Sequence, residues 1–204
     1  MTITISRLYP SHRAAREAVR ALEGAGVKHG DISILVSNAD GSYDEKNKTF
    51  PDRDLDGKDD RAEAAGTGAG IGAAAGGAVG ALTGLGLMAI PGVGPIVAAG
   101  WLAATLTGAA AGAATGGVVG ALTQAGVSDE DAHVYAEGLR RGGALVSARV
   151  NDADAGRLQA LIDRSSIAVA DRANAYRSTG WKTFDPNADP YTADQVRKER
   201  DLYR

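Results

Sequence analysis

The pattern of apolar and polar positions divides the chain into two mixed outer parts and one uncharged central stretch. In the first outer part, residues 2–8 alternate apolar and polar side chains, which predicts a strand. A helix is expected next, because Ser11 suits an N-cap and apolar residues then recur at helical spacing up to Gly24 or Gly26. Residues 31–36 form a second apolar run, so the chain opens with a strand–helix–strand unit.

The second outer part repeats this kind of pattern. Ser128 is the expected N-cap of a helix over 129–141, and residues 144–150 follow as a strand. A further helix is predicted over 152–164, and a last strand over 167–170. Two such halves are typical of an α+β fold, here a ferredoxin-like α/β sandwich, with the central stretch inserted between the second and third strands.

The central stretch runs from Ala64 to Ser128, and its 65 residues contain no Asp, Glu, Lys, Arg or His. Glycine or alanine recurs there at every fourth position. Residues four apart share one face of a helix, so each row predicts a groove that another helix can approach closely. The helix-packing groove is assigned to the glycines of the two rows: Gly68, Gly72, Gly76, Gly80, Gly84, Gly100, Gly108, Gly112, Gly116 and Gly120.

The central stretch is also an internal repeat, because residues 67–86 match residues 107–126 at 14 of 20 positions. We predict two helices, about 66–90 and 95–124, that form a glycine-zipper hairpin. Proline suits a first helical turn and glycine suits a tight reversal, so the turn is assigned to Pro91, Gly92, Gly94 and Pro95. The alternative is a flexible linker, but a linker would be rich in Ser, Lys, Glu or Pro and would lack a fixed glycine spacing.

Each predicted helix is long enough to cross a lipid bilayer. At 1.5 Å per residue each helix spans roughly 37 Å or more, and the apolar core of a bilayer is about 30 Å thick. The strongest apolar residues gather near the turn, whereas the outer parts of the two helices are rich in Gly, Ala and Thr. The hairpin is therefore expected to associate with a membrane, with other copies of the chain, or with both. The alternative is a soluble homo-oligomer whose hairpins pack only against each other.

Composition narrows the classes of function. The net charge of −3 argues against nucleic acid as a partner, and the absence of cysteine excludes disulfides and thiolate chemistry. Residues 1–13 lack the basic and apolar parts of a secretory signal, so we expect the cytoplasm or the cytoplasmic side of the inner membrane. His12, His29 and His133 are scattered, and the common hydrolase, zinc and phosphate-loop motifs are absent. We expect no catalytic residues and no enzymatic activity, and the sequence identifies no small-molecule substrate.

An acidic loop precedes the central stretch. Asp52, Asp54, Asp56 and Glu63 fit the twelve-residue calcium loop, which places oxygen ligands at positions 1, 3, 5 and 12. The alternative is that the acidic side chains only solvate and cap the first central helix. Calcium is therefore the one candidate cofactor. A calcium-responsive switch that acts through this loop is an alternative function.

The C-terminal tail contains a charged helix, predicted over 192–204, with Thr192 and Gln195 spaced as a capping box. Its basic side chains would contact anionic lipid or a neighbouring subunit, or else face solvent. Tyr135 and Glu137 are also expected on a solvated helix face. The chain thus divides into five parts. The two halves of an α/β domain are 1–40 and 128–177, the acidic linker is 41–63, the helical hairpin is 64–127, and the tail is 178–204.

Three stretches carry a resemblance to a known family: DDRAEAAGTGAG at 59–70, AIPGVGPIVAAG at 89–100 and EDAHVYAEGLRRGGALVSARV at 130–150. Together with the strand–helix–strand opening, they resemble bacterial general stress (heat-induced stress) proteins, in the version with a glycine-zipper insertion, over residues 1–175. The resemblance implies a small α/β domain and stress-linked expression, and it supplies no catalytic residues. The expected function is that of a non-enzymatic, stress-responsive protein that associates with membrane or self-assembles through the hairpin.

Overall fold

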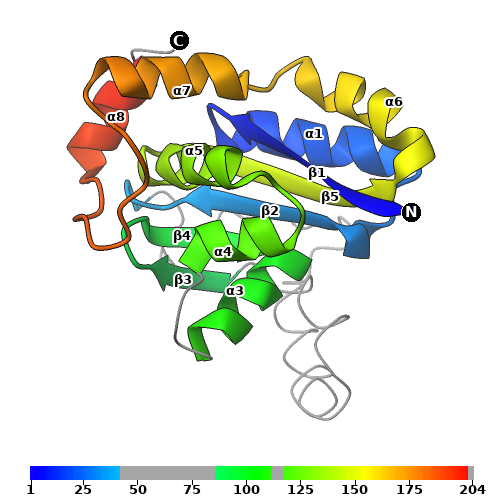
Figure 1. Ribbon diagram of the computed structural model, residues 1–204, viewed down its shortest axis with the longest axis horizontal. Helices are drawn as coiled ribbons and strands as arrows, with labels where there is room; N and C mark the ends of the chain where they lie inside the picture. The colour runs from blue at the N-terminus through cyan, green and yellow to red at the C-terminus, as the bar shows by residue number, and fades with distance from the viewer. Residues whose placement is uncertain (42–85, 112–116, 202–204) are drawn as a thin grey trace, which may run out of the picture.

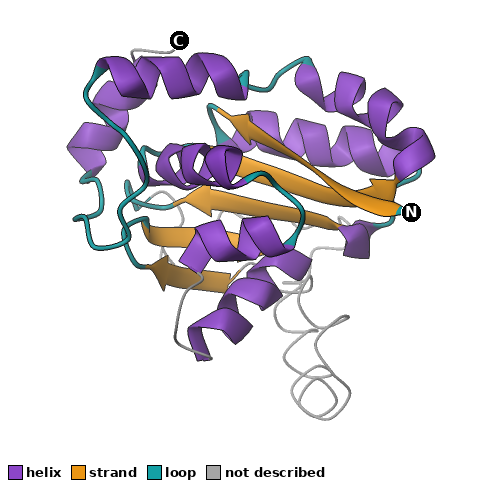
Figure 2. Ribbon diagram, viewed as in Figure 1, coloured by secondary structure: helices purple, strands orange, loops and turns teal. Residues whose placement is uncertain are grey.

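The computed structural model describes residues 1–41, 86–111 and 117–201, which form a mixed α+β fold (Figure 1). Its sheet has five antiparallel strands in the order β1-β5-β2-β4-β3. The strands are β1 (Thr2–Tyr9), β2 (Ile32–Ser37), β3 (Gly86–Ile90), β4 (Gly94–Ala99) and β5 (Ala144–Asn151). Helices cover both faces of this sheet (Figure 2).

One helical layer consists of α1 (His12–Gly24) and α6 (Asp152–Asp163). The other consists of α3 (Trp101–Ala111), α4 (Gly117–Gln124) and α5 (Asp129–Arg140). A short 3₁₀ turn, η1 (His29–Asp31), leads into β2. The chain continues through α7 (Val169–Ser178), which packs on α5, to α8 (Ala193–Asp201) beyond the C-terminal end of β2 (Figure 1).

The predicted strand–helix–strand opening is confirmed. The Ser11 hydroxyl caps α1 by accepting a hydrogen bond from the backbone N–H of Ala14, at 3.3 Å. Both β1 and β2 pair with β5, which lies between them, so Ser147 is opposite Ser6 on one side and Ser33 on the other. The two halves of the chain therefore interlock in one sheet.

Alternation along the strands divides the core between the two helical layers. Ile5, Val36 and Val146 are buried against α1 and α6. Leu35 and Leu145, one residue away in their strands, are buried against the layer of α3, α4 and α5. Because successive strand residues point to opposite faces, the central strands are buried on both sides.

The predicted turn between two long helices is wrong. Residues 86–90 and 94–99 form the β3–β4 hairpin, and β4 continues the sheet by pairing with β2, with Ile96 opposite Ser37. Val93, at the tip, is completely buried and belongs to the core of the domain.

Within the predicted second helix, residues 101–111 and 117–124 are helical, in α3 and α4, and residues 112–116 lie outside the described residues. The prediction for residues 66–85 lies outside the described residues. Across the described ranges, no helix combines the length and the apolar character that membrane crossing requires.

The last predicted strand, over 167–170, is also wrong. Ile167 makes one bridge to Leu8, with its N–H donating to the Leu8 carbonyl at 2.8 Å, and α7 begins two residues later. The predicted capping box at the start of α8 is confirmed: the Thr192 N–H donates to Gln195 Oε1 at 2.8 Å, and the Gln195 N–H donates to Thr192 Oγ1 at 3.4 Å.

Candidate functional site

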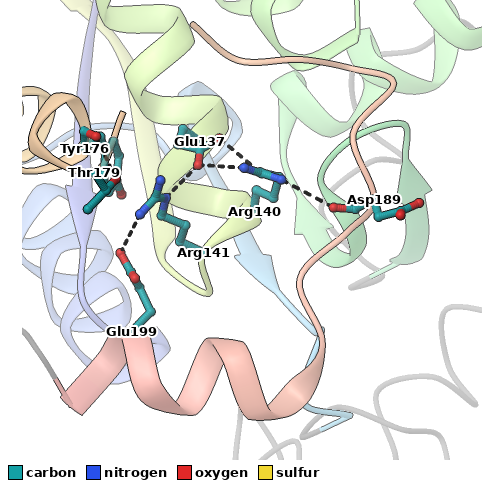
Figure 3. Close-up of polar contacts among 7 residues, drawn as sticks. All are labelled: Glu137, Arg140, Arg141, Tyr176, Thr179, Asp189 and Glu199. Carbon is teal, nitrogen blue, oxygen red and sulfur yellow. Dashed lines mark hydrogen bonds and ion pairs between the residues drawn. The ribbon is translucent and has the colours of Figure 1, made fainter. Parts of the chain in front are cut away.

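A buried ion cluster lies at the C-terminal end of α5, under the tail (Figure 3). Glu137 is at its centre and has no exposed surface. Arg140 donates from Nε to Glu137 Oε2 at 3.0 Å and from Nη2 to Oε1 at 2.9 Å, and Arg141 donates from Nε to Oε1 at 2.6 Å. A carboxylate buried this deeply is stable only because it is paired and hydrogen-bonded.

Arg141 connects this cluster to α8 and α7. Its Nη1 donates to Glu199 Oε1 at 3.2 Å, and its guanidinium stacks over the Tyr176 ring at 4.2 Å (Figure 3). Burial alone would lower the pKa of Arg141, but the hydrogen bond and negative charge of Glu137 outweigh burial and raise that pKa above its ordinary value. Arg141 is therefore a permanent cation inside the domain.

The tail is fastened across the same region by polar contacts. Arg140 donates to the Asp189 carbonyl at 3.3 Å, and its guanidinium lies 4.8 Å from the centre of the Tyr191 ring. Arg200 pairs with Asp40 at 2.5 Å and donates from Nη2 to the Gly142 carbonyl at 3.2 Å. Asp40 belongs to the first half of the domain and Gly142 to the second. These contacts join the tail to both halves of the α/β domain.

Close packing adds to these polar contacts. Val196 of α8 is completely buried, and a Cβ at Gly142 would lie 2.3 Å from its Cγ1. A Cβ at Gly92, in the tip of the β3–β4 hairpin, would lie 2.6 Å from the carbonyl oxygen of Asp185. The tail therefore packs on glycines of two separate turns.

A cavity of about 30 Å³ lies between the tail, the end of β1, the turn after α5, and α7. That volume exceeds what one water molecule needs. Three arginines line it, together with one glutamate and two tyrosines: Arg141, Arg172, Arg200, Glu199, Tyr9 and Tyr176. We treat this arginine-lined cavity as the candidate site.

The predicted glycine groove is not assembled as expected in the described residues. Gly100 does not belong to a helix: it lies between β4 and α3 with a φ of +93°, and a Cβ there would lie 2.4 Å from the Ile32 carbonyl oxygen. Gly108 lies in α3 and Gly120 in α4. The other groove glycines are outside the described residues: Gly68, Gly72, Gly76, Gly80, Gly84, Gly112 and Gly116.

The predicted turn residues form a turn of a different kind. Pro91, Gly92 and Val93 join β3 to β4, and Gly94 is the first residue of β4. Gly92 and Gly94 both have positive φ, at +73° and +97°. Pro95 is the second residue of β4 and is opposite Ala89. The proposed calcium ligands lie outside the described residues, so the structure does not bear on calcium: Asp52, Asp54, Asp56 and Glu63.

Sequence reasoning missed the ion cluster. Tyr135 and Glu137 were predicted on a solvated face of their helix, yet Tyr135 is 4% exposed and Glu137 is 0% exposed. Burial raises the pKa of Tyr135 to about 12, and its hydroxyl donates to the Ser6 carbonyl at 2.8 Å. Arg200 is one of the basic residues of the tail helix that were predicted to contact anionic lipid or a neighbouring subunit, or to face solvent. It instead contacts Asp40 and Gly142. The available signal was the i, i+3, i+4 spacing of Glu137 with two arginines, but such spacing is also common on exposed helix faces.

Comparison of the chain with models of protein families, with curated proteins and with solved structures finds no match.

Proposed function

We propose that this chain is a non-enzymatic, stress-responsive protein that associates with copies of itself through its glycine-rich repeat. The α/β domain serves as the platform. The first copy of the repeat falls in the connection between β2 and β3, two strands of the same sheet. The stress-linked part of the proposal rests on the resemblance of the sequence to general stress proteins.

The observation that supports self-association is the use of the second repeat copy. In α4, Val118 and Leu122 have no exposed surface and Ala121 is 2% exposed. This helix contacts α5, where Ala132 and Ala136 are completely buried in the same cluster. Small side chains on both helices permit a close approach of their backbones. A sequence of this kind therefore works as a helix-packing element in this chain.

The first copy, residues 67–85, has nearly the same sequence. We propose that it packs in the same way against the first copy of a second chain. We favour this over insertion into a membrane for a specific reason. Three of the strong apolar residues near the predicted turn, Ile90, Ile96 and Leu102, are 6%, 0% and 0% exposed and belong to the domain core. They are not free to enter lipid.

We also infer that the architecture is a ferredoxin-like sandwich with an insertion. Two features support this relationship. β1, α1 and β2 form a split strand–helix–strand unit, because β5 lies between its two strands, and α6 packs on the same face of the sheet as α1. The fourth strand of that fold corresponds to the single bridge between Leu8 and Ile167. The insertion then comprises the β3–β4 hairpin and the repeat.

The experiment that tests self-association is a comparison of two leucine substitutions. Gly76→Leu places a leucine side chain in the glycine row. Ala78→Leu adds the same side chain two residues later, which is about 200° further round a helix and therefore outside the row. Overpacking a helix interface costs about 1–3 kcal/mol per site, so Gly76→Leu is expected to lower the oligomer mass in light scattering while Ala78→Leu leaves it unchanged. Equal masses for the wild type and both variants would show that the row is not an interface.

A further inference from the structure

We propose that the arginine-lined cavity binds a small oxyanion, a phosphate or carboxylate group, and that Glu199 of α8 is an internal carboxylate that competes for the same arginine. This inference concerns the α/β domain and does not depend on self-association. It rests on the hydrogen-bonding capacity of Arg141, on the other guanidinium groups of the cavity and on the position of Glu199.

Arg141 is the main donor. It is 8% exposed, and it lines the cavity. Within the described residues, two of its five N–H groups donate to carboxylates, one to Glu137 and one to Glu199. The guanidinium can make further hydrogen bonds, and an acceptor bound in the cavity that Arg141 lines could receive them.

Arg172 and Arg200 add to the positive charge around the same space. Arg172 is 7% exposed, and its guanidinium lies 5.8 Å from the Tyr176 ring that also supports Arg141. The Nη1 and Nη2 groups of Arg200, which also lines the cavity, donate to Asp40 and to the Gly142 carbonyl. Planar guanidinium forks match the oxygens of carboxylate and phosphate groups, so an oxyanion is the ligand class that suits this lining.

Glu199 is the group that an incoming oxyanion would replace. Its contact with Arg141 is 3.2 Å long, whereas the contact between Arg141 and Glu137 is 2.6 Å. Charge-assisted hydrogen bonds are usually about 2.7–2.9 Å, so the Glu199 contact is the weaker of the two. Glu137 would keep Arg141 in place while a bound oxyanion takes over the position of the Glu199 carboxylate.

The test is calorimetric titration of the full chain with sodium phosphate and, separately, with sodium acetate, at constant ionic strength set by sodium chloride. Both the wild type and Glu199→Gln are expected to bind at least one of the two anions, and the variant about tenfold more tightly because the competing charge is gone. Glu130→Gln is the matched control: it removes one negative charge from an exposed ion pair with Arg177 and should leave the affinity at the wild-type value. Arg141→Lys, which keeps the charge but loses the fork, is expected to weaken binding by about tenfold or more.

The two titrants also distinguish a phosphate ligand from a carboxylate ligand. Saturable binding that Glu199→Gln strengthens and Glu130→Gln does not would support the site. The proposal is overturned if neither anion binds the wild type or Glu199→Gln, or if both glutamine variants change the affinity equally. The comparison of the two glutamine variants decides the matter even if Arg141→Lys fails to fold. The self-association experiment reads oligomer mass, so the failure of one proposal leaves the other standing.

Discussion

Replacing Glu137 by alanine is expected to lower the free energy of unfolding by about 3–5 kcal/mol, the usual cost of removing one partner from a buried ion pair. Glu137 is completely buried and accepts three hydrogen bonds from Arg140 and Arg141. Without it, two guanidinium groups that are 16% and 8% exposed lose their main counter-charge. Arg140 and Arg141 also fasten the tail, through Asp189 and Glu199, so the loss extends beyond α5.

The matched control is Glu130→Ala in the same helix. Glu130 is 73% exposed and pairs with Arg177, so its removal should change the free energy of unfolding by about 0.5 kcal/mol or less. Urea unfolding of the two variants and the wild type at one protein concentration measures both effects. If Glu137→Ala were as stable as Glu130→Ala, the ion cluster would not contribute to holding the domain together.

Replacing Gly100 by alanine is expected to destabilise the domain by about 3 kcal/mol, through two effects that add. A positive φ costs an L-residue roughly 1–2 kcal/mol, and Gly100 has a φ of +93°. The new Cβ would also lie 2.4 Å from the Ile32 carbonyl oxygen and 2.7 Å from the Ser33 Cα. Both atoms belong to the backbone of β2, a central strand, so the overlap cannot be relieved by rotating a side chain.

Gly126→Ala separates the two effects. Gly126 has nearly the same φ, +91°, but a Cβ there meets no atom within 4 Å. Its substitution is therefore expected to cost only the backbone term, about 1 kcal/mol. Thermal and urea unfolding of both variants give the difference. Equal destabilisation would mean that the close approach of Gly100 to β2 does not contribute, and that the β4–α3 connection can shift at little cost.

The outer parts of the fold were predictable because their signals are local. Strand alternation in residues 2–8 and 144–150, and the serine caps at Ser11 and Ser128, each depend on a few neighbouring residues, and the structure contains all of them. The pairing of β5 between β1 and β2 is a long-range feature. This pairing could be predicted only by assuming that two similar halves of the chain build one sheet.

The β3–β4 hairpin was missed because a short, uncharged apolar run has the same appearance in a buried strand and in a buried helix. The regular glycine spacing favoured the helix. Two signals for strands were present in the sequence: β-branched residues at Ile90, Val93, Ile96 and Val97, and two glycines beside prolines at the tip. At Gly92 and Gly94 the glycines serve a tight strand reversal with positive φ, rather than a reversal between helices.

The candidate site could not be predicted because it depends on where the tail packs. Its arginines come from the turn after α5, from α7 and from α8. Nothing in the sequence around Arg141 or Arg172 indicates that they share a cavity with Arg200. The charges of α8 resemble those of any solvated helix. Its one buried residue, Val196, packs on Gly142 and brings Glu199 to Arg141.

Sedimentation equilibrium of the unmodified chain tests the central claim, self-association, most directly. The experiment is done over a wide range of protein concentrations in detergent-free buffer, because the proposed partner is a second copy of the chain rather than lipid. The account predicts a mass that exceeds the 20.7 kDa of one chain and rises with concentration towards a fixed multiple of it. A single species of 20.7 kDa at every concentration would contradict the account.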